Sequence, residues 1–402
     1  MIISRKWFNK LFIISAILLI IAAPNQYSIE IMPKTFLSAA DVISLITFFF
    51  LLLSDFRIYL PKVARKMPIG IIFLLLWMCI SIINAEKKLK AAKEIIQSIE
   101  YFVVIYSLFA CSWQNSFLRK YFFKSAWIIA SVILLSALAQ YAMPHIDSFH
   151  VRGTFGNNNV LGGFLSLTAP TIFAFMIHAT QKRIFVLSFL GLLACLFLAM
   201  HGGALAGIII SIILIAYFKN RRIGFLTVLL LIIGISLCVP FFPRSNTKIM
   251  ADSLSIFDND GVPTQRYTEW QAGIFMIAEN PVLGVGAGNY QNNIGMYYGY
   301  LPSPEHASEP DSQNLYIVLA SSCGIPALIF FLAFMIEVIC RLLYRYFYSA
   351  NAIFISAAGG IIAFLIACIW SPLLVRGIGP SLAFLLSLHA IPLSDDIPTK
   401  PL

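Results

Sequence analysis

Long apolar runs recur along the chain, each near the length of about twenty residues that a helix needs to cross a membrane. A window of that length finds about twelve such runs. Their approximate ranges are 8–24, 35–54, 68–85, 95–113, 121–143, 160–180, 184–201, 204–218, 223–242, 314–340, 351–373 and 377–393. Peptide groups in hydrocarbon need internal hydrogen bonds, so each run predicts a helix. The sequence therefore predicts an all-α, polytopic integral membrane protein.

The composition excludes the soluble alternatives. Hydrophobic residues make up 59% of the 402 residues and charged residues only 11%, whereas soluble domains carry about 25% charged residues. A soluble chain could not bury that much apolar surface in one or two cores. The seven cysteines lie singly and never in a C-x-x-C spacing, which predicts no metal site and no cofactor.

The basic residues indicate an orientation in the membrane. The net charge is +10, but the lysines and arginines form short clusters between apolar runs rather than a stripe that would bind nucleic acid. If the helices alternate, the clusters fall on one side, which the positive-inside rule makes cytoplasmic, with both termini there. The first run is then a retained helix rather than a signal peptide. Residues 86–94 disagree, because they carry four lysines on the outer side. They form either an amphipathic helix at the membrane interface, or the count of spans near them is wrong.

The outer side carries two polar loops. Residues 1–242 hold nine predicted helices with an outer loop at 144–159, residues 243–313 form a large outer loop, and 314–402 hold three further helices and the C-terminus. A connection of about seventy residues exceeds ordinary loops and is usually functional or disordered. It holds an aromatic, helix-like segment and the glycine-rich turn PVLGVGAGNY at 281–290. We expect a partly helical cap over the outer face, in the periplasm.

The loop at 144–159 contains Arg152, which opens the stretch RGTFGNNN. The three asparagines that end this stretch precede an apolar run, so Asn157 and Asn159 are candidates to cap a helix. Alternatively, Arg152 and the exposed helix N-terminus form an anion site.

The large loop contains Arg266, whose guanidinium can bind phosphate oxygens in bidentate fashion or pair with Glu269. Tyr267 and Trp270 offer flat faces for sugar rings or anchors at the membrane interface. GVGAGN at 284–289 lacks the strand–turn–helix context of a nucleotide site.

A run of polar residues, EHASEPDSQN at 305–314, closes the large loop just before an apolar run. It contains His306 and Asp311, candidates for a general base, although a solvated loop explains them as well.

Three segments together resemble the bacterial O-antigen ligase and O-antigen polymerase family over roughly 150–330. They are RGTFGNNNVLGGFL, Arg266 followed by Trp270 and PVLGVGAGN, and Gln313-Asn314 followed after nine residues by GIPA. The resemblance implies a metal-independent, inverting glycosyltransferase of the bacterial inner membrane. Such enzymes move a glycan from an undecaprenyl-diphosphate carrier to lipid A–core (ligases) or to a second carrier-linked unit (polymerases).

The resemblance also implies site residues. Arg266 matches the arginine expected to hold the diphosphate, and Arg152 the arginine that opens the asparagine-rich segment. Two positions depart from the ligases, because Gln313 replaces a histidine and Gly202, in the turn His201-Gly202-Gly203, replaces an arginine. We expect Arg266, Arg152, His306 and Asp311 to be catalytic. The expected substrate-binding residues are Asn157, Asn159, Trp270, Tyr267, Gln313, Asn314 and His201.

Other functions remain open at this stage. The missing histidine and the intact glycine turn slightly favour a polymerase over a ligase. A transporter or a flippase for lipid-linked oligosaccharides also has about twelve helices, but the chain shows no convincing internal repeat. A non-catalytic scaffold would follow if the two altered positions had abolished the chemistry.

Overall fold

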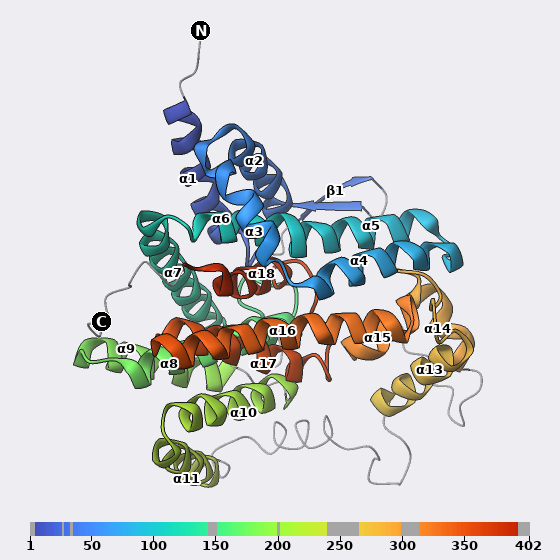
Figure 1. The fold of residues 1–402 in the computed structure, drawn as a ribbon. Helices are drawn as coiled ribbons and strands as arrows, with labels where there is room; N and C mark the ends of the chain where they lie inside the picture. Colours follow the sequence, from blue (N-terminus) through green and yellow to red (C-terminus); the bar gives the residue numbers. More distant parts are fainter. Residues whose placement is uncertain are drawn as a thin grey trace.

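The computed structural model describes residues 5–25, 28–32, 35–143, 151–198, 202–238, 265–298 and 313–392. Helices dominate these residues, and long helices run roughly side by side through a bundle (Figure 1). The first part of the chain forms α1 (Arg5–Ala22), β1 (Ser28–Met32), β2 (Thr35–Ser38), α2 (Ala39–Leu53), the 3₁₀ turn η1 (Asp55–Tyr59) and α3 (Leu60–Lys66).

A two-stranded antiparallel hairpin, β1–β2, interrupts the predicted all-α architecture. It corrects the predicted helix at 35–54, because residues 35–38 pair with β1 and the helix starts only at Ala39. Ser38 ends the strand and caps α2: its hydroxyl accepts a hydrogen bond from the Asp41 backbone N–H (3.2 Å), while the Asp41 carboxylate accepts from the Ser38 N–H (2.9 Å). Such a reciprocal capping box fixes where the helix begins.

In the described ranges of the middle of the chain, helices are joined by short turns and by the loop that precedes α8. Its elements are α4 (Ile69–Ser81), η2 (Ile82–Asn84), α5 (Lys88–Ile99), the π-helical η3 (Glu100–Ile105), α6 (Tyr106–Ser112), α7 (Ser116–Tyr141), α8 (Asn158–His178), α9 (Lys182–Leu198), α10 (Gly202–Lys219) and α11 (Arg221–Cys238). The lysine-rich residues 86–94 are therefore not a separate interfacial helix. Most of them form the first turns of one long helix that continues to Ser112.

The last part of the chain forms α13 (Gln265–Glu279), α14 (Tyr290–Tyr298), α15 (Leu315–Cys323), α16 (Ile325–Ser349), α17 (Ala352–Ala367), α18 (Gly379–Ser387) and η6 (Leu388–Ala390). The predicted helical content of the large loop is confirmed by α13 and α14. The apolar run at 314–340 is not one straight helix, since Gly324 separates α15 from α16.

Four described helices are long and apolar enough to cross a membrane, namely Lys88–Ser112, Ser116–Tyr141, Asn158–His178 and Ile325–Ser349. The pair formed by Ala39–Leu53 and Asp55–Lys66 is bent by 85° and brings the number to five if it counts as one span. Shorter apolar helices lie in other predicted runs, at Ile69–Asn84, Gly203–Lys219, Ala352–Ala367 and Gly379–Ala390. The membrane-helix character is thus confirmed, whereas the count of about twelve spans is not.

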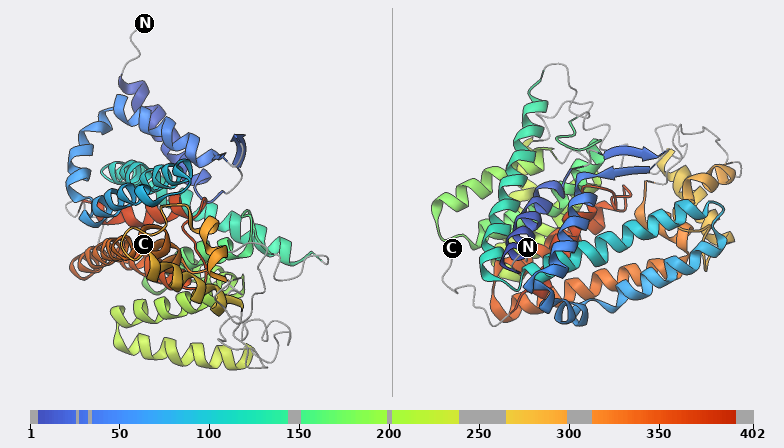
Figure 2. Two further views of the ribbon diagram at one scale, coloured as in Figure 1. Left: turned by 90° about the vertical axis from the view of Figure 1, so that its right-hand side faces the viewer. Right: turned by 90° about the horizontal axis from the view of Figure 1, so that it is seen from above.

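The bundle has two chemically distinct ends. We call the end that carries α13, α14 and the start of α5 the loop end; it lies at the right in Figure 1 and again in the view from above in Figure 2. At the opposite, basic end, Lys66 Nζ donates to Ala390 O (3.3 Å), Arg341 to Lys66 O and Arg345 to Ile391 O. Two of the predicted basic clusters, one with Lys66 and one with Arg341 and Arg345, therefore meet at one end of the molecule.

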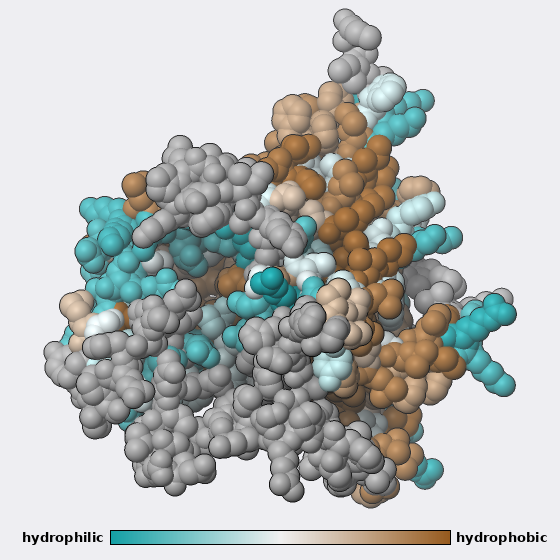
Figure 3. All heavy atoms as spheres, turned by 180° about the vertical axis from the view of Figure 1, so that it is seen from behind, coloured by the Kyte–Doolittle hydropathy of each residue, from teal (hydrophilic) through white to brown (hydrophobic). Residues whose placement is uncertain are grey.

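The surface between these ends is apolar. Seen from behind, a broad hydrophobic band separates the hydrophilic surface of the loop end, at the left, from scattered hydrophilic side chains at the right edge (Figure 3). Large side chains such as Leu135, Leu187 and Phe225 are 65–71% exposed. A soluble protein rarely exposes a contiguous apolar surface of this extent, so the band is the expected lipid-facing belt.

Candidate functional site

The glycine-rich turn at 281–289 packs closely against the break between α15 and α16. Gly284 has φ +64°, and a Cβ there would lie 2.4 Å from the Ser322 carbonyl carbon. Gly324 has φ +84°, and its Cβ would lie 1.9 Å from Val282 O. Only glycine fits backbones that approach this closely in these conformations. The glycine pattern is therefore explained by close packing of the backbone.

The same turn is hydrogen-bonded to α4, to η2 and to the residue that precedes α5. Asn84 Nδ2 donates to Gly284 O (3.0 Å), and the Lys87 N–H donates to Asn289 Oδ1 (3.0 Å). The Trp77 indole donates to Val282 O (3.2 Å) and to Cys323 O (3.1 Å). The lysine-rich segment at 86–94 thus lies against the large loop, on the side to which the alternation of helices assigns it.

The loop before α8 is held by Gln140 at the end of α7. Gln140 Oε1 accepts from the backbone N–H groups of Arg152 (3.1 Å) and Gly153 (2.9 Å), and its amide donates to Gly153 O (2.7 Å). Asn157 caps α8, accepting from the Val160 N–H (2.9 Å), as the capping interpretation predicts. Arg152 is exposed.

The start of α15 is held by a second asparagine cap. Asn314 Oδ1 accepts from the N–H groups of Tyr316 (2.9 Å) and Ile317 (3.2 Å), and the Leu315 N–H donates to Cys368 O (2.9 Å). Gln313, which stands where the ligases have a histidine, has φ +48°. Positive φ is uncommon for a residue with a side chain and costs on the order of 1 kcal/mol or more.

These segments meet around a cavity of about 570 Å³ at the loop end. Gly156 comes from the RGTFGNNN loop, Gly288 from the glycine turn, Gln291 from α14 and Leu315 from the start of α15. Its further lining residues are Leu74, Met78, Glu94, Gln97, Ser98, Phe102, Tyr290, Val318, Leu319, Ser322, Cys323, Phe331, Pro372, Leu374, Val375 and Arg376. The three segments that carry the family resemblance therefore face one space.

Arg376 and Glu94 are the charged residues among those that line the cavity. Arg376 lies in the irregular connection between α17 and α18, and its Nε is 3.3 Å from Asp41 Oδ2. Its side chain is 21% exposed and that of Asp41 10%. Glu94 comes from α5, with Gln97 one turn further along. The lining of the cavity thus contains one guanidinium, one carboxylate and the two side-chain amides of Gln97 and Gln291.

Sequence reasoning missed both charged residues, although a signal for each was present. Arg376 is the lone cation between the apolar runs 351–373 and 377–393, on the side to which the alternation of helices also assigns the large loop. Glu94 ends the lysine-rich segment, whose position on the outer side looked anomalous. A charged residue that faces the interior of a membrane bundle is by default a functional candidate, and both residues line the cavity.

Several predicted site residues do not line this cavity. Tyr267 and Trp270 lie on α13, half-buried, and the Trp270 indole nitrogen is buried without a hydrogen-bond partner among the described residues. The Asn159 Oδ1 atom is also buried without a hydrogen-bond partner among the described residues. Native structures rarely leave such atoms unsatisfied.

Four predicted residues are placed only in part or not at all. Arg266 is the second residue of α13, and its side chain lies outside the described part of the structure. His201, His306 and Asp311 lie outside the described residues altogether.

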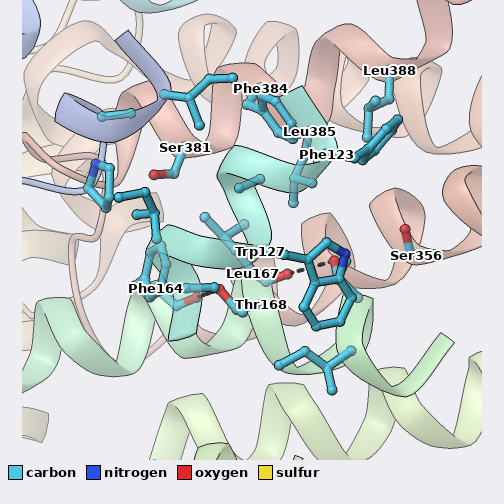
Figure 4. Close-up of a pocket in the computed structure, with 18 of the residues that line it drawn as sticks. Phe123, Trp127, Phe164, Leu167, Thr168, Ser356, Ser381, Phe384, Leu385 and Leu388 are labelled. Atoms are coloured by element: carbon cyan, nitrogen blue, oxygen red, sulfur yellow. Dashed lines mark hydrogen bonds between the residues drawn. The ribbon is translucent and has the colours of Figure 1, made fainter. Parts of the chain in front are cut away.

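A second pocket, of about 120 Å³, is apolar and lies between α7, α8, α17 and α18 (Figure 4). Phe123, Trp127, Phe164 and Phe384 line it. Four hydroxyl groups also face it, but each donates to a carbonyl of its own helix or turn: Thr168, Thr171, Ser356 and Ser381. This pocket suits an apolar chain and offers little to a glycan.

Helices, apolar belt and cavity define a helical membrane protein with a candidate site at one end. The family model described as O-antigen ligase matches residues 187–332, from α9 to the first turns of α16. No curated protein matches the chain. The family match confirms the resemblance to the O-antigen ligase and polymerase family. It implies a membrane-bound, glycosyltransferase-like enzyme that uses lipid-linked glycans.

Proposed function

We propose that the protein transfers a glycan from an undecaprenyl-diphosphate carrier to an acceptor hydroxyl on the periplasmic face of the bacterial inner membrane. The reaction belongs to the assembly of O-antigen or an exopolysaccharide, with a second carrier-linked unit slightly favoured over lipid A–core as acceptor. The observation that carries this proposal is the convergence of Gly156, Gly288 and Leu315, one from each family segment, on one cavity.

In the proposed reaction, the acceptor hydroxyl attacks the anomeric carbon and inverts it, without a metal ion. Negative charge grows on the departing diphosphate, which Arg266 and Arg152 stabilise. Preorganised charges of this kind are often the largest contribution to catalysis. His306 or Asp311 takes the hydroxyl proton as general base. Asn157, Asn159, Tyr267, Trp270, Gln313, Asn314 and His201 contribute to substrate binding.

The proposed topology retains about twelve spans, with residues 243–313 in the periplasm and both termini in the cytoplasm. Two features support it. The lysine-rich start of α5 contacts the large loop at the loop end, and Lys66, Arg341 and Arg345 gather at the basic end.

An in vitro reaction tests the function. Purified full-length protein is mixed with cognate carrier-linked repeat units, with and without lipid A–core, in EDTA throughout. A ladder of longer carrier-linked glycans is expected from a polymerase, and a shift of lipid A–core from a ligase. No product with verified cognate substrates would contradict the proposal and favour a transporter.

A further inference from the structure

Basic side chains from two helices gather at the basic end of the bundle. Lys62 and Lys66 lie one turn apart on α3, and Arg341 and Arg345 lie one turn apart on α16. Residues four apart share one face of a helix. The guanidinium of Arg341 joins the two pairs, because it donates to Lys66 O. We call these four residues the Lys–Arg cluster.

The charges of the Lys–Arg cluster are only partly compensated. Lys66 has two positively charged neighbours, Lys62 and Arg345, and Arg341 is a positively charged neighbour of Arg345. The ion pair that the cluster forms with the described residues joins Arg341 to Glu337. Four cations and one carboxylate leave a net charge of +3. Like charges held this close repel one another, and an anion placed between them relieves the repulsion.

The cluster keeps N–H donors for such an anion. Lys66 donates to Ala390 O (3.3 Å) with one of its three N–H groups, and Arg345 donates to Ile391 O through one terminal nitrogen of its five-donor guanidinium. Lys62 is exposed, and its ammonium forms no hydrogen bond or ion pair with a described residue. The bonds to main-chain carbonyls thus hold Lys66 and Arg345 in place without using all their donors.

An exposed stripe on α16 leads from the apolar belt to the Lys–Arg cluster. Its members recur at intervals of three, four or seven residues, which places them on one side of the helix. They are Ile329, Ile336, Cys340, Tyr344 and Phe347, and each is exposed. Arg341 and Arg345 border the stripe, since each directly follows one of its members. Aromatic side chains beside basic ones are typical of the level of the lipid headgroups.

We propose that Lys62, Lys66 and Arg345 bind the headgroup phosphate of an anionic phospholipid, with an acyl chain along the stripe on α16. Basic pockets between membrane helices bind such headgroups on the cytoplasmic side, to which the proposed topology assigns this end. The lipid neutralises the Lys–Arg cluster and links α3 to α16 as a structural component. The inference goes beyond glycan transfer, because no step of that reaction uses the basic end.

The test is a titration of the purified full-length protein in detergent micelles with phosphatidylglycerol and, separately, with phosphatidylcholine, followed by native mass spectrometry. The wild type is expected to prefer phosphatidylglycerol and to melt at a higher temperature in its presence. Lys62→Gln is expected to weaken phosphatidylglycerol binding about fivefold, the effect of one basic residue near anionic lipid. Since Lys62 forms no bond with a described residue, its loss is expected to leave the melting temperature without added lipid unchanged.

Two further variants separate a site from diffuse attraction. Lys62→Arg keeps the charge and is expected to keep most of the affinity. Lys120→Gln removes an exposed lysine of α7 that belongs to another predicted basic cluster, and it is expected to bind as the wild type does. An equal loss of affinity in Lys120→Gln and Lys62→Gln would overturn the inference, because any basic residue would then have the same effect.

Wild-type affinity in Lys62→Gln would also overturn it, as would equal affinity of the wild type for the two lipids. Inorganic phosphate that binds as tightly as phosphatidylglycerol would assign the cluster to a free anion instead. Asp395 and Asp396 follow Ile391 closely in sequence and lie outside the described residues. If only Asp395→Asn/Asp396→Asn prefers phosphatidylglycerol, the carboxylates of the chain itself occupy the cluster and the lipid assignment is wrong. Because no glycan is present in these titrations, failure here leaves the proposed function untouched.

Discussion

At the loop end of the bundle, Arg376 pairs with Asp41 beside the cavity, whereas at the basic end Lys66, Arg341 and Arg345 donate to main-chain carbonyls and Arg341 also pairs with Glu337. Cations near the ends of helices satisfy carbonyls that have no partner within the helix. The basic end therefore uses its charges to close helix ends and to fix orientation. At the loop end, the glycine turn and the asparagine caps close the helix breaks, and Arg376 lines the cavity while paired with Asp41.

The largest expected effect concerns Arg266, the second residue of α13. Arg266→Ala is expected to lower glycan transfer by about 100- to 1000-fold, because one preorganised charge on the leaving diphosphate is lost. The measurement is the initial rate with carrier-linked repeat units, together with the amount of protein inserted in the membrane, which is expected to stay at the wild-type level. Unaltered transfer would remove Arg266 from the site.

The next effect concerns the glycine turn. Gly284→Ala is expected to lower the free energy of unfolding by about 3 kcal/mol or more, since the methyl group meets the Ser322 backbone and the residue is forced to a positive φ. Thermal melting in detergent measures it. Gly295→Ala on α14 is the matched control, because a Cβ there has no neighbour within 4 Å. Equal melting temperatures of the two variants would show that close packing at Gly284 does not stabilise the fold.

The smallest effect concerns the basic end. Arg345 donates to Ile391 O and lies over the Phe354 ring, 5.6 Å from its centroid. Arg345→Met is expected to cost about 1.5–3 kcal/mol of stability, typical of a hydrogen bond to a charged group, while transfer per folded molecule stays unchanged. Melting and rate are measured on the same preparation. A large loss of rate without a loss of stability would show that Arg345 contributes to transfer, so that the basic end would not be purely structural.

Most helices could be predicted from sequence, because a peptide group in hydrocarbon has few alternatives to the helix. Asn157 was likewise recognisable as a cap, since its polar side chain directly precedes an apolar run. The hairpin was missed because Phe36 and Leu37 extend the apolar run of the helix that follows them. The break at Gly324 was missed because its cause, the approach of Val282, comes from a segment some forty residues earlier.

The site was predictable only in part, for the same physical reason. Local motifs identified the loop at 152–159, the glycine turn and the start of α15, but motifs do not say which distant segments complete a cavity. Glu94 and Arg376 reach it through the packing of α5 and of the connection after α17. Neither belongs to one of the local motifs, so the importance of each follows from its three-dimensional neighbourhood.

The backbone bonds of the glycine turn have a mechanical consequence. The Ile325 N–H donates to Pro281 O (2.8 Å), and the Val285 N–H donates to Ser321 O (2.9 Å). These two main-chain hydrogen bonds join the turn that follows α13 to the junction of α15 and α16. A displacement of this turn, for example by a bulky glycan, is therefore transmitted to α16. Residues 281–285 and the start of α16 therefore move together.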